Sequence, residues 1–228
     1  MTKNKVYPNP ADAVADIPNG ASVMVGGFGM AGYPQALVVA LRDRGIQDLT
    51  IICNSCGGTR EDRLDVGILI KAGMVRKAIA SIGVLPGNSA PEVEEQWADG
   101  RLDVELSPQG TLAERIRAGG AGIGGFYTPI GPGTLIDKGK ERREIDGTSP
   151  LLELPIRADY AFVQAHRADK LGNLVYRRTA RNFNPIMATA AKVTIAEVES
   201  IVKPEDLDPE RVGTSSIYID RIIQADRP

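Results

Sequence analysis

Glycines gather where a short apolar run gives way to a helical pattern. Val23–Val25 has the composition of a buried strand, and a helix with apolar residues three and four apart starts near Pro34. Glycine lets the backbone approach a ligand closely, and the N-terminal dipole of such a helix attracts a carboxylate or a phosphate. The sequence therefore predicts an anion-accepting loop after this strand, with a purely structural turn as the alternative. The candidate binding residues of the loop are Gly26, Gly27, Phe28, Gly29 and Gly32.

A second glycine run, Gly120–Gly125, fits the G-x-G-x-x-G spacing of dinucleotide-binding loops. That fingerprint follows a strand and opens a helix, so that a pyrophosphate meets the helix N-terminus. Here the glycines follow a predicted helix, and the segment Phe126–Pro129 that comes next has no helical pattern. The position of the run argues against a nicotinamide site, and therefore against an oxidoreductase.

Cys53 and Cys56 form a C-x-x-C pair directly after an apolar run. A structural zinc site needs about four ligands, whereas the chain has two cysteines and one histidine, so we expect no metal. A redox pair would stand at the start of a helix, but Gly57 follows instead. The single histidine, His166, has no obvious nucleophile beside it, and we expect a structural role for it.

Charge and composition exclude other classes. The 27 basic and 29 acidic side chains leave a net charge of −2, whereas phosphate backbones need clustered Lys and Arg, so no nucleic-acid partner is expected. Acidic residues interrupt the basic run Lys138–Arg143, which is typical of a solvated loop or hairpin. No apolar stretch approaches the ~18 residues of a membrane span, and residues 1–16 lack the apolar core of a signal peptide. We expect a cytoplasmic protein with no membrane partner.

Strands and helices alternate through the first half, which is typical of βαβ units on a largely parallel sheet. The second half has strands with fewer helices between them, and Gly172-Asn173 is a hairpin turn dipeptide. We therefore expect an α/β fold with a more mixed, strand-rich C-terminal half, in one domain over residues 1–228. The expected strands are 23–25, 49–52, 78–82, 102–106, 161–163, 174–176, 193–195 and 217–219, and the expected helices are 34–44, 65–72, 90–99 and 111–118.

Three long motifs resemble those of the family I CoA-transferases of the alpha-subunit type. They occur in the family's order, and the resemblance runs from about residue 6 to residue 223. The motifs are NGASVMVGGFGMAGYP (19–34), VELSPQGTLAERIRAGGAGIGGFYTPIGPGTL (104–135) and RTARNFNPIMATAAKVTIAEVE (178–199).

The resemblance implies an enzyme that moves CoA from an acyl-CoA to a free carboxylic acid, with the CoA thioester as substrate and no resident cofactor. In the family, a glutamate attacks the donor thioester, forms a mixed anhydride and then receives CoA as a glutamyl thioester, in a ping-pong route. That glutamate lies in an E-N-G-type motif on the beta subunit, and this chain has no such motif. The resemblance implies a heterotetramer whose beta subunit supplies the nucleophile. Glu105, which alternates outward from its apolar neighbours, is expected to be a surface or interface residue.

Two further site candidates come from the same resemblance. Gln109 matches a family glutamine that faces the reacting glutamyl carbonyl, where a neutral amide can donate to a developing oxyanion; a turn or helix cap is the alternative role. Asn54 and Ser55 stand where the family usually has two adjacent asparagines, so the resemblance implies substrate contacts. The serine in place of the second asparagine leaves its role, and the acid that is accepted, open.

The segments GKERREIDG (139–147) and NPIMATAAK (184–192) look closest to 3-oxoacid and 3-oxoadipate transferases that use succinyl-CoA. A transferase for a plain short-chain acid, of the acetate or butyrate type, is one alternative. A non-catalytic small-molecule-binding module of related fold is another, and would be expected to carry a DNA-binding segment. Motifs alone do not separate the acids.

Overall fold

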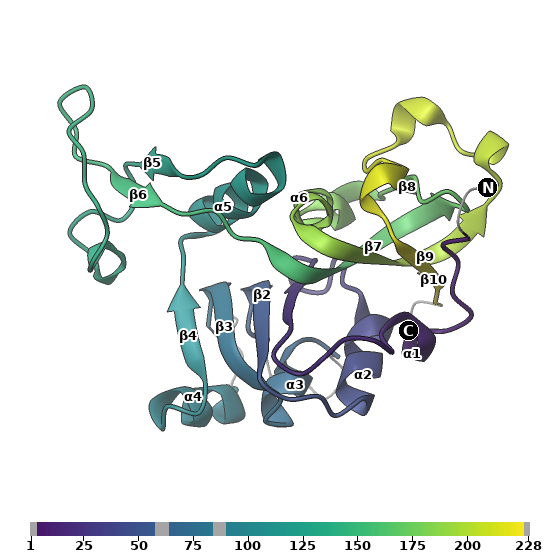
Figure 1. Cartoon of the computed structure of the whole chain (residues 1–228), viewed down its shortest axis with the longest axis horizontal. Helices are drawn as coiled ribbons and strands as arrows, with labels where there is room; N and C mark the ends of the chain where they lie inside the picture. Colours follow the sequence, from purple (N-terminus) through teal and green to yellow (C-terminus); the bar gives the residue numbers. More distant parts are fainter. Residues whose placement is uncertain (1–3, 58–63, 84–89, 226–228) are drawn as a thin grey trace.

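The computed structural model describes residues 4–57, 64–83 and 90–225. These residues form an eight-stranded sheet in the order β10-β9-β7-β1-β2-β3-β4, with β8 paired to β7 (Figure 1). All pairings in the sheet are parallel except β7 with β8. The strands are β1 (Ser22–Val25), β2 (Leu49–Ser55), β3 (Val75–Ile82), β4 (Asp103–Leu106), β7 (Ala158–Asp169), β8 (Leu174–Val175), β9 (Ala191–Val202) and β10 (Arg221–Gln224).

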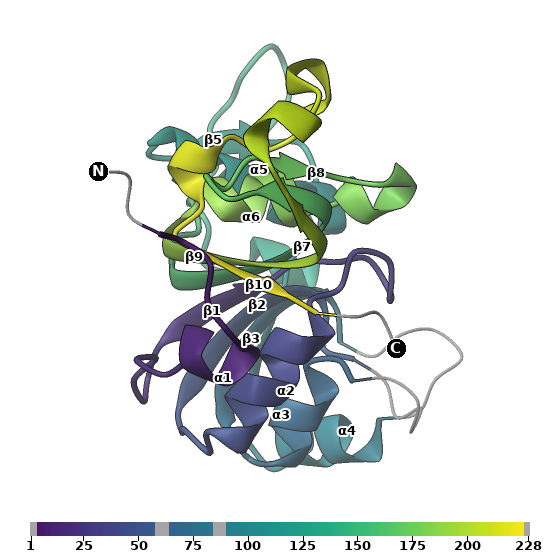
Figure 2. The same cartoon turned by 90° about the vertical axis from the view of Figure 1, so that its right-hand side faces the viewer.

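Helices cover both faces of this sheet, with α1 to α4 on one side and α5 and α6 on the other (Figure 2). Strand residues alternate between the two faces: Val23 and Val25 pack in the core under α1 to α4, and Met24 packs in the core under α5 and α6. Burial on both faces explains why the strands read as apolar runs. The helices are α1 (Pro10–Ala13), α2 (Gln35–Asp43), α3 (Gly67–Lys71), α4 (Pro91–Ala98), α5 (Gln109–Ala121) and α6 (Asn184–Thr189).

The strand order changes direction at β1. From β1 the chain adds β2, β3 and β4 on one side, while β7, β9 and β10 lie on the other. In open α/β sheets, ligands bind beyond the carboxyl ends of the strands at such a switch point. The loop after β1 and the ends of β2 and β4 all lie at this edge.

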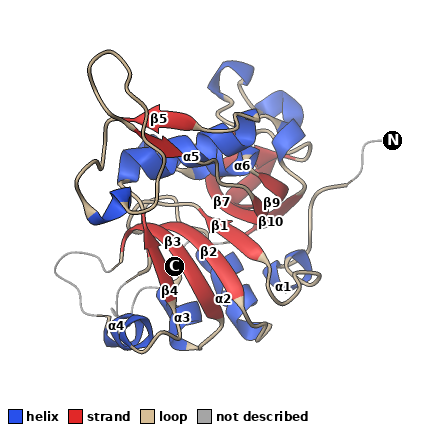
Figure 3. Ribbon diagram, turned by 60° about the vertical axis from the view of Figure 1, so that its left-hand side comes forward, coloured by secondary structure: helices blue, strands red, loops and turns tan. Residues whose placement is uncertain are grey.

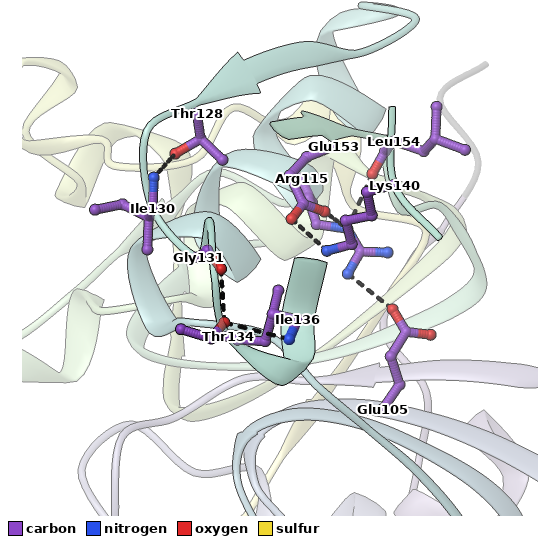
Figure 4. A network of polar contacts seen from close by, with 10 residues as sticks. All are labelled: Glu105, Arg115, Thr128, Ile130, Gly131, Thr134, Ile136, Lys140, Glu153 and Leu154. Carbon is purple, nitrogen blue, oxygen red and sulfur yellow. Dashed lines mark hydrogen bonds and ion pairs between the residues drawn. The ribbon is translucent and has the colours of Figure 1, made fainter. Parts of the chain in front are cut away.

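A separate antiparallel sheet, β5 (Phe126–Thr128) with β6 (Leu151–Glu153), stands beyond α5 as a projecting arm (Figures 1 and 3). Arg115 of α5 binds Glu105 of β4 over 2.8 Å and the Leu154 carbonyl over 3.0 Å (Figure 4). Lys140, from the connection between β5 and β6, pairs with Glu153, which is 2% exposed. The basic run 138–143 therefore lies in a loop, as predicted, but Lys140 is not simply solvated, because it neutralises a buried carboxylate.

The structure confirms the α/β class and places the non-parallel pairing of the C-terminal half in the β5–β6 sheet and the β7–β8 hairpin. The strand expected at 217–219 is wrong: Ser216–Tyr218 is a 3-10 turn, and the parallel edge strand is β10 instead. Isolated apolar residues gave a strand-like run there, but Ile217 is 79% exposed and has no face to bury.

The helix expected to close at Gly119 continues to Ala121 and ends at Gly122, which has a φ of 74°. A Cβ on Gly119 would lie 2.0 Å from the Ile156 carbonyl oxygen, and one on Gly120 would lie 2.2 Å from the Thr189 hydroxyl. The glycine run therefore allows close packing of α5 against α6 and the segment before β7. This is a structural role, in keeping with the argument against a dinucleotide site.

Candidate active site

The loop after β1 is held by asparagines from the segment that leads into α6. Asn182 accepts a hydrogen bond from the Gly27 N–H over 3.1 Å and donates to the Ala31 carbonyl over 2.9 Å. Asn184, which is fully buried, donates to the Gly32 carbonyl over 2.9 Å and accepts from the Gln164 N–H over 3.0 Å. Two motifs that are some 150 residues apart in sequence thus form one unit.

Two glycines of the loop are required by these contacts. A Cβ on Gly26 would lie 1.9 Å from the Asn184 side-chain oxygen, and one on Gly32 would lie 2.3 Å from the Ala180 carbonyl oxygen. Gly32 also has a φ of 64°, which disfavours other residues. Gly26 and Gly32 therefore serve the packing of the loop, while Gly29 has open space around it and Phe28 is 50% exposed.

Gln109 and Asn54, predicted from separate motifs, are in direct contact. The Gln109 side-chain nitrogen donates to the Asn54 side-chain oxygen over 2.7 Å. Ser81, at the end of β3, lies 2.8 Å from the same oxygen and 2.7 Å from the Asn54 carbonyl oxygen. Asn54 is 3% exposed, whereas Gln109 is exposed at the surface. The buried asparagine thus orients a glutamine that remains accessible.

A small crevice lies between the glycine loop after β1 and the end of β2. Gly27, Gly29, Asn54 and Ser55 are among its lining residues, so four of the predicted residues meet there. Ser55 is partly buried, and its hydroxyl accepts the Gly57 N–H over 3.1 Å, which shapes the turn after β2. Gly26, Phe28 and Gly32 do not line the crevice.

The start of α2, where an anion was expected, carries a carboxylate of the chain itself. The carboxylate of Glu197, from β9, accepts the Leu37 N–H over 3.1 Å. Glu197 is 8% exposed, so the chain's own carboxylate already occupies the position that the helix dipole favours. At the Leu37 N–H, a carboxylate from within the chain therefore takes the place that was expected for a ligand.

The two cysteines are buried and the histidine is bonded to a glutamate, which fits structural roles for all three. Cys53 and Cys56 are free thiols, 2% and 0% exposed. The hydrogen bond to Cys56, together with burial, raises the pKa of Cys53 well above its ordinary value, so the reactive thiolate is disfavoured. His166 binds Glu199 of the neighbouring strand over 2.7 Å.

Sequence reasoning missed Ser81, Asn182 and Asn184 as parts of the site. The two asparagines belong to a motif that the sequence made conspicuous, Arg178–Glu199, but nothing in one sequence shows which loop an amide contacts. Ser81 closes an apolar run and carries no signal of its own. Among the described residues, no group of three or more His, Cys, Asp or Glu side chains is placed to hold a metal ion. None of the described helices combines the length and apolar character needed to cross a membrane.

The architecture is that of an open α/β protein with its candidate site at the strands' carboxyl edge. The family model "Coenzyme A transferase" matches residues 7–225, and the chain belongs to this family of CoA-transferase enzymes. It is 47% identical to the A-type subunit of 3-oxoadipate CoA-transferase from Pseudomonas putida, over 96% of this chain and 93% of that one. It is 46% identical to the A-type subunit of a probable succinyl-CoA:3-ketoacid CoA-transferase from Bacillus subtilis, over 96% and 89%.

Solved structures agree on the fold. An acyl-CoA transferase of Escherichia coli O157:H7 matches with a TM-score of 0.85 at 23% identity over 98% of this chain, which spans 48% of that longer one. Glutaconate coenzyme A-transferase from Acidaminococcus fermentans matches with a TM-score of 0.84 at 21% identity over 97% of this chain and 76% of that one. The described β-sheet and its helices are therefore a fold that known CoA-transferases share.

Proposed function

We propose that this chain is the A-type (alpha) subunit of a CoA-transferase that moves CoA from succinyl-CoA to a 3-oxoacid such as acetoacetate or 3-oxoadipate. The observation that carries the proposal is the identity of 46–47% to subunits with those names along almost the whole chain. The names of the relatives imply a second, beta-type subunit, and this chain has no E-N-G-type motif of its own. The proposed partner carries the nucleophilic glutamate.

In the proposed reaction, a carboxylate oxygen of the partner's glutamate bonds to the thioester carbonyl carbon, and the carbonyl electron pair moves to its oxygen. The resulting oxyanion collapses, the C–S bond breaks, and CoA leaves as a thiolate from the mixed anhydride. The thiolate then bonds to the glutamyl carbonyl carbon and expels the donor acid as a carboxylate. The second half runs the same steps in reverse with the acceptor acid.

In this proposal, the chain contributes hydrogen-bond donors that stabilise the oxyanions formed in those steps. Gln109 is exposed and its amide is fixed by Asn54, so its second N–H is free to donate toward a partner's reacting carbonyl. A neutral donor stabilises negative charge that develops without holding the ground-state carboxylate in an ion pair. The glycine loop, fixed by Asn182 and Asn184, supplies backbone beside the same crevice.

The test is reconstitution. The purified chain alone should transfer no CoA from succinyl-CoA, because the nucleophile is missing, and adding a companion subunit with an E-N-G-type motif should restore transfer. Acetoacetate, 3-oxoadipate and acetate, offered in parallel, separate a 3-oxoacid enzyme from one for plain short-chain acids. Transfer by this chain free of any partner would refute the proposal, and so would a reconstituted pair that accepts only acetate.

A further inference from the structure

Arg178 has a backbone conformation that its residue type does not explain. Its φ is 52°, in the left-handed region, where a side chain crowds the backbone. Among the described residues, Asp48 and Asp146 are the only other non-glycine residues with a positive φ, and aspartate tolerates that region well. Glycine is the usual residue at such a position. A long charged side chain therefore stands where the backbone favours none, and strain of this kind gathers at ligand contacts.

The side chain of Arg178 is exposed and, within the part of the chain that the structure describes, makes no hydrogen bond or ion pair. The two neighbouring arginines are engaged. Arg177 pairs with Glu199 over 3.5 Å. A guanidinium nitrogen of Arg181 lies 2.8 Å from the position that a Cβ on Gly213 would take, so this side chain packs against that segment. Neither an ion pair nor burial accounts for the charge of Arg178.

The turn that carries Arg178 is in contact with the glycine loop after β1. Arg178–Arg181 is a 3-10 turn. A Cβ on Gly32 would lie 2.3 Å from the Ala180 carbonyl oxygen, so the turn and the loop touch. Two residues of the same loop, Gly27 and Gly29, line the crevice of the candidate site. The unpaired guanidinium therefore belongs to a turn that packs on the wall of the site.

The substrates of the proposed reaction carry negative charge away from the carbonyl that reacts. CoA has phosphate groups at the end opposite its thiol. A succinyl group and 3-oxoadipate have a second carboxylate, whereas acetoacetate and acetate have none. A guanidinium group presents paired N–H donors that match the oxygens of a carboxylate or a phosphate. Arg178 is therefore chemically suited to hold the far end of such a substrate.

We propose that Arg178 is a specificity-determining residue that binds an oxyanion group of the substrate remote from the reacting carbonyl. The inference rests on the proposed function and deepens it. The group has two sources, the second carboxylate of a dicarboxylic substrate and a phosphate of CoA, and both offer paired oxygens to the same guanidinium. The strained backbone then has a reason, because glycine at this position would have no side chain to bind with.

Arg178→Gln, with Arg76→Gln as its matched control, tests the site in the assembled enzyme. Arg76 is also exposed but lies near the amino end of β3, at the opposite edge of the sheet. In Arg178→Gln the KM of one substrate should rise by about 10-fold to 100-fold with kcat little changed, because a charged hydrogen bond is lost away from the reacting carbonyl. Arg76→Gln should match wild type. KM values that are unchanged in Arg178→Gln for every substrate overturn the proposal.

The reverse reaction, from acetoacetyl-CoA to succinate, separates the two sources. Succinate has a second carboxylate and no phosphate, whereas acetoacetyl-CoA has phosphates and no second carboxylate. If only the KM of succinate rises in Arg178→Gln, the residue binds the carboxylate. If the KM of acetoacetyl-CoA rises, it binds a phosphate of CoA. Either result supports the proposal.

Arg178→Gly tests the backbone argument. Glycine adopts a φ of 52° without crowding, so the melting temperature of this variant should be at least that of Arg178→Gln, while its KM rises to the same extent. A lower melting temperature than that of Arg178→Gln would show that the turn does not favour glycine, and would overturn the proposal.

A binding measurement keeps the site distinct from the reaction. If the reconstituted wild-type pair transfers no CoA, the proposed function fails. Calorimetric titration of the same pair with succinate and with CoA then decides the role of Arg178 alone. Weaker binding of either compound by Arg178→Gln than by Arg76→Gln supports that role. Equal binding of both compounds by the two variants, or no binding by wild type, overturns it.

Discussion

The side-chain nitrogen of Gln109 lies 2.7 Å from the side-chain oxygen of Asn54, although the two residues are 55 positions apart. Gln109 opens α5 and Asn54 is the next-to-last residue of β2, so the contact joins the ends of two elements at the sheet's carboxyl edge. Asn54 is buried and also bonded to Ser81, so it has little freedom to turn. The pair therefore holds an exposed amide in one orientation without using up both of its donors.

Gln109→Ala should lower the kcat of the assembled enzyme by about 10²–10³ without blocking assembly, because an oxyanion donor is lost. Gln109→Glu should be at least as damaging, since a second carboxylate repels the nucleophile and the anionic intermediate. Steady-state kinetics with the partner present measure both. Near-normal turnover in both variants would reduce Gln109 to a turn residue, and a loss that tracks with failure to bind the partner would make it an interface residue.

Asn184→Ala should destabilise the chain by about 2–5 kcal/mol, because it leaves the Gly32 carbonyl and the Gln164 N–H buried without their partner. Gly26→Ala should also destabilise, since its methyl group meets the Asn184 oxygen. The two effects should be less than additive in the double variant, where the clash is gone. Denaturant unfolding of all four proteins measures the coupling. Strict additivity would show that the two residues do not compete for the same space.

Much of the fold was predictable because the central strands, such as β1 and β2, are buried on both faces. The short apolar runs at Val23–Val25 and 49–52 indicate buried strands of a parallel sheet. The arm was not predictable: β5 and β6 have only three residues each, and an ion pair between Lys140 and the buried Glu153 holds part of it in place. Such pairings form between distant positions, and a single sequence gives no sign of them.

The sequence indicated which residues belong to the site, but not which contacts each of them makes. The Asn54–Gln109 contact joins two residues that motifs singled out separately. The sequence does not show that the Glu197 carboxylate accepts the Leu37 N–H at the start of α2, because β9 and α2 are far apart along the chain. At the start of α5, by contrast, Pro108 makes no side-chain cap and the first turn has no acidic side chain.

Replacing Cys53 and Cys56 with serine together should leave most of the activity of the assembled enzyme. Both thiols are buried and the pKa of Cys53 is raised, so neither is suited to nucleophilic or redox chemistry. The exchange puts hydroxyls into an apolar core and should lower thermal stability. Turnover per assembled enzyme, corrected for folded protein, is the measurement. Total loss of turnover in a folded, assembled double variant would overturn the structural role.

Asp159→Asn should lower thermal stability at neutral pH by no more than about 1 kcal/mol, with turnover unchanged. A hydrogen bond from Lys192 first, and then bonds from the Ser22 N–H and hydroxyl, lower the pKa of Asp159 to about 2. Lys192 is 79% exposed, and solvent screens the pair, which limits its effect on stability.

The sign of the pH dependence follows from the direction of that shift. A carboxyl whose pKa is lower in the folded chain than in the unfolded chain, where it is about 3.9, stabilises the fold above that value and ceases to do so as pH falls toward 2. The difference in melting temperature between wild type and Asp159→Asn should therefore shrink between about pH 4 and pH 2. Lys192→Met keeps both Ser22 bonds to Asp159. Its melting temperature at pH 7 should therefore differ less from that of wild type than the melting temperature of Asp159→Asn does. A difference that stays constant down to pH 2 would show that the Asp159 charge contributes nothing and that only its shape matters.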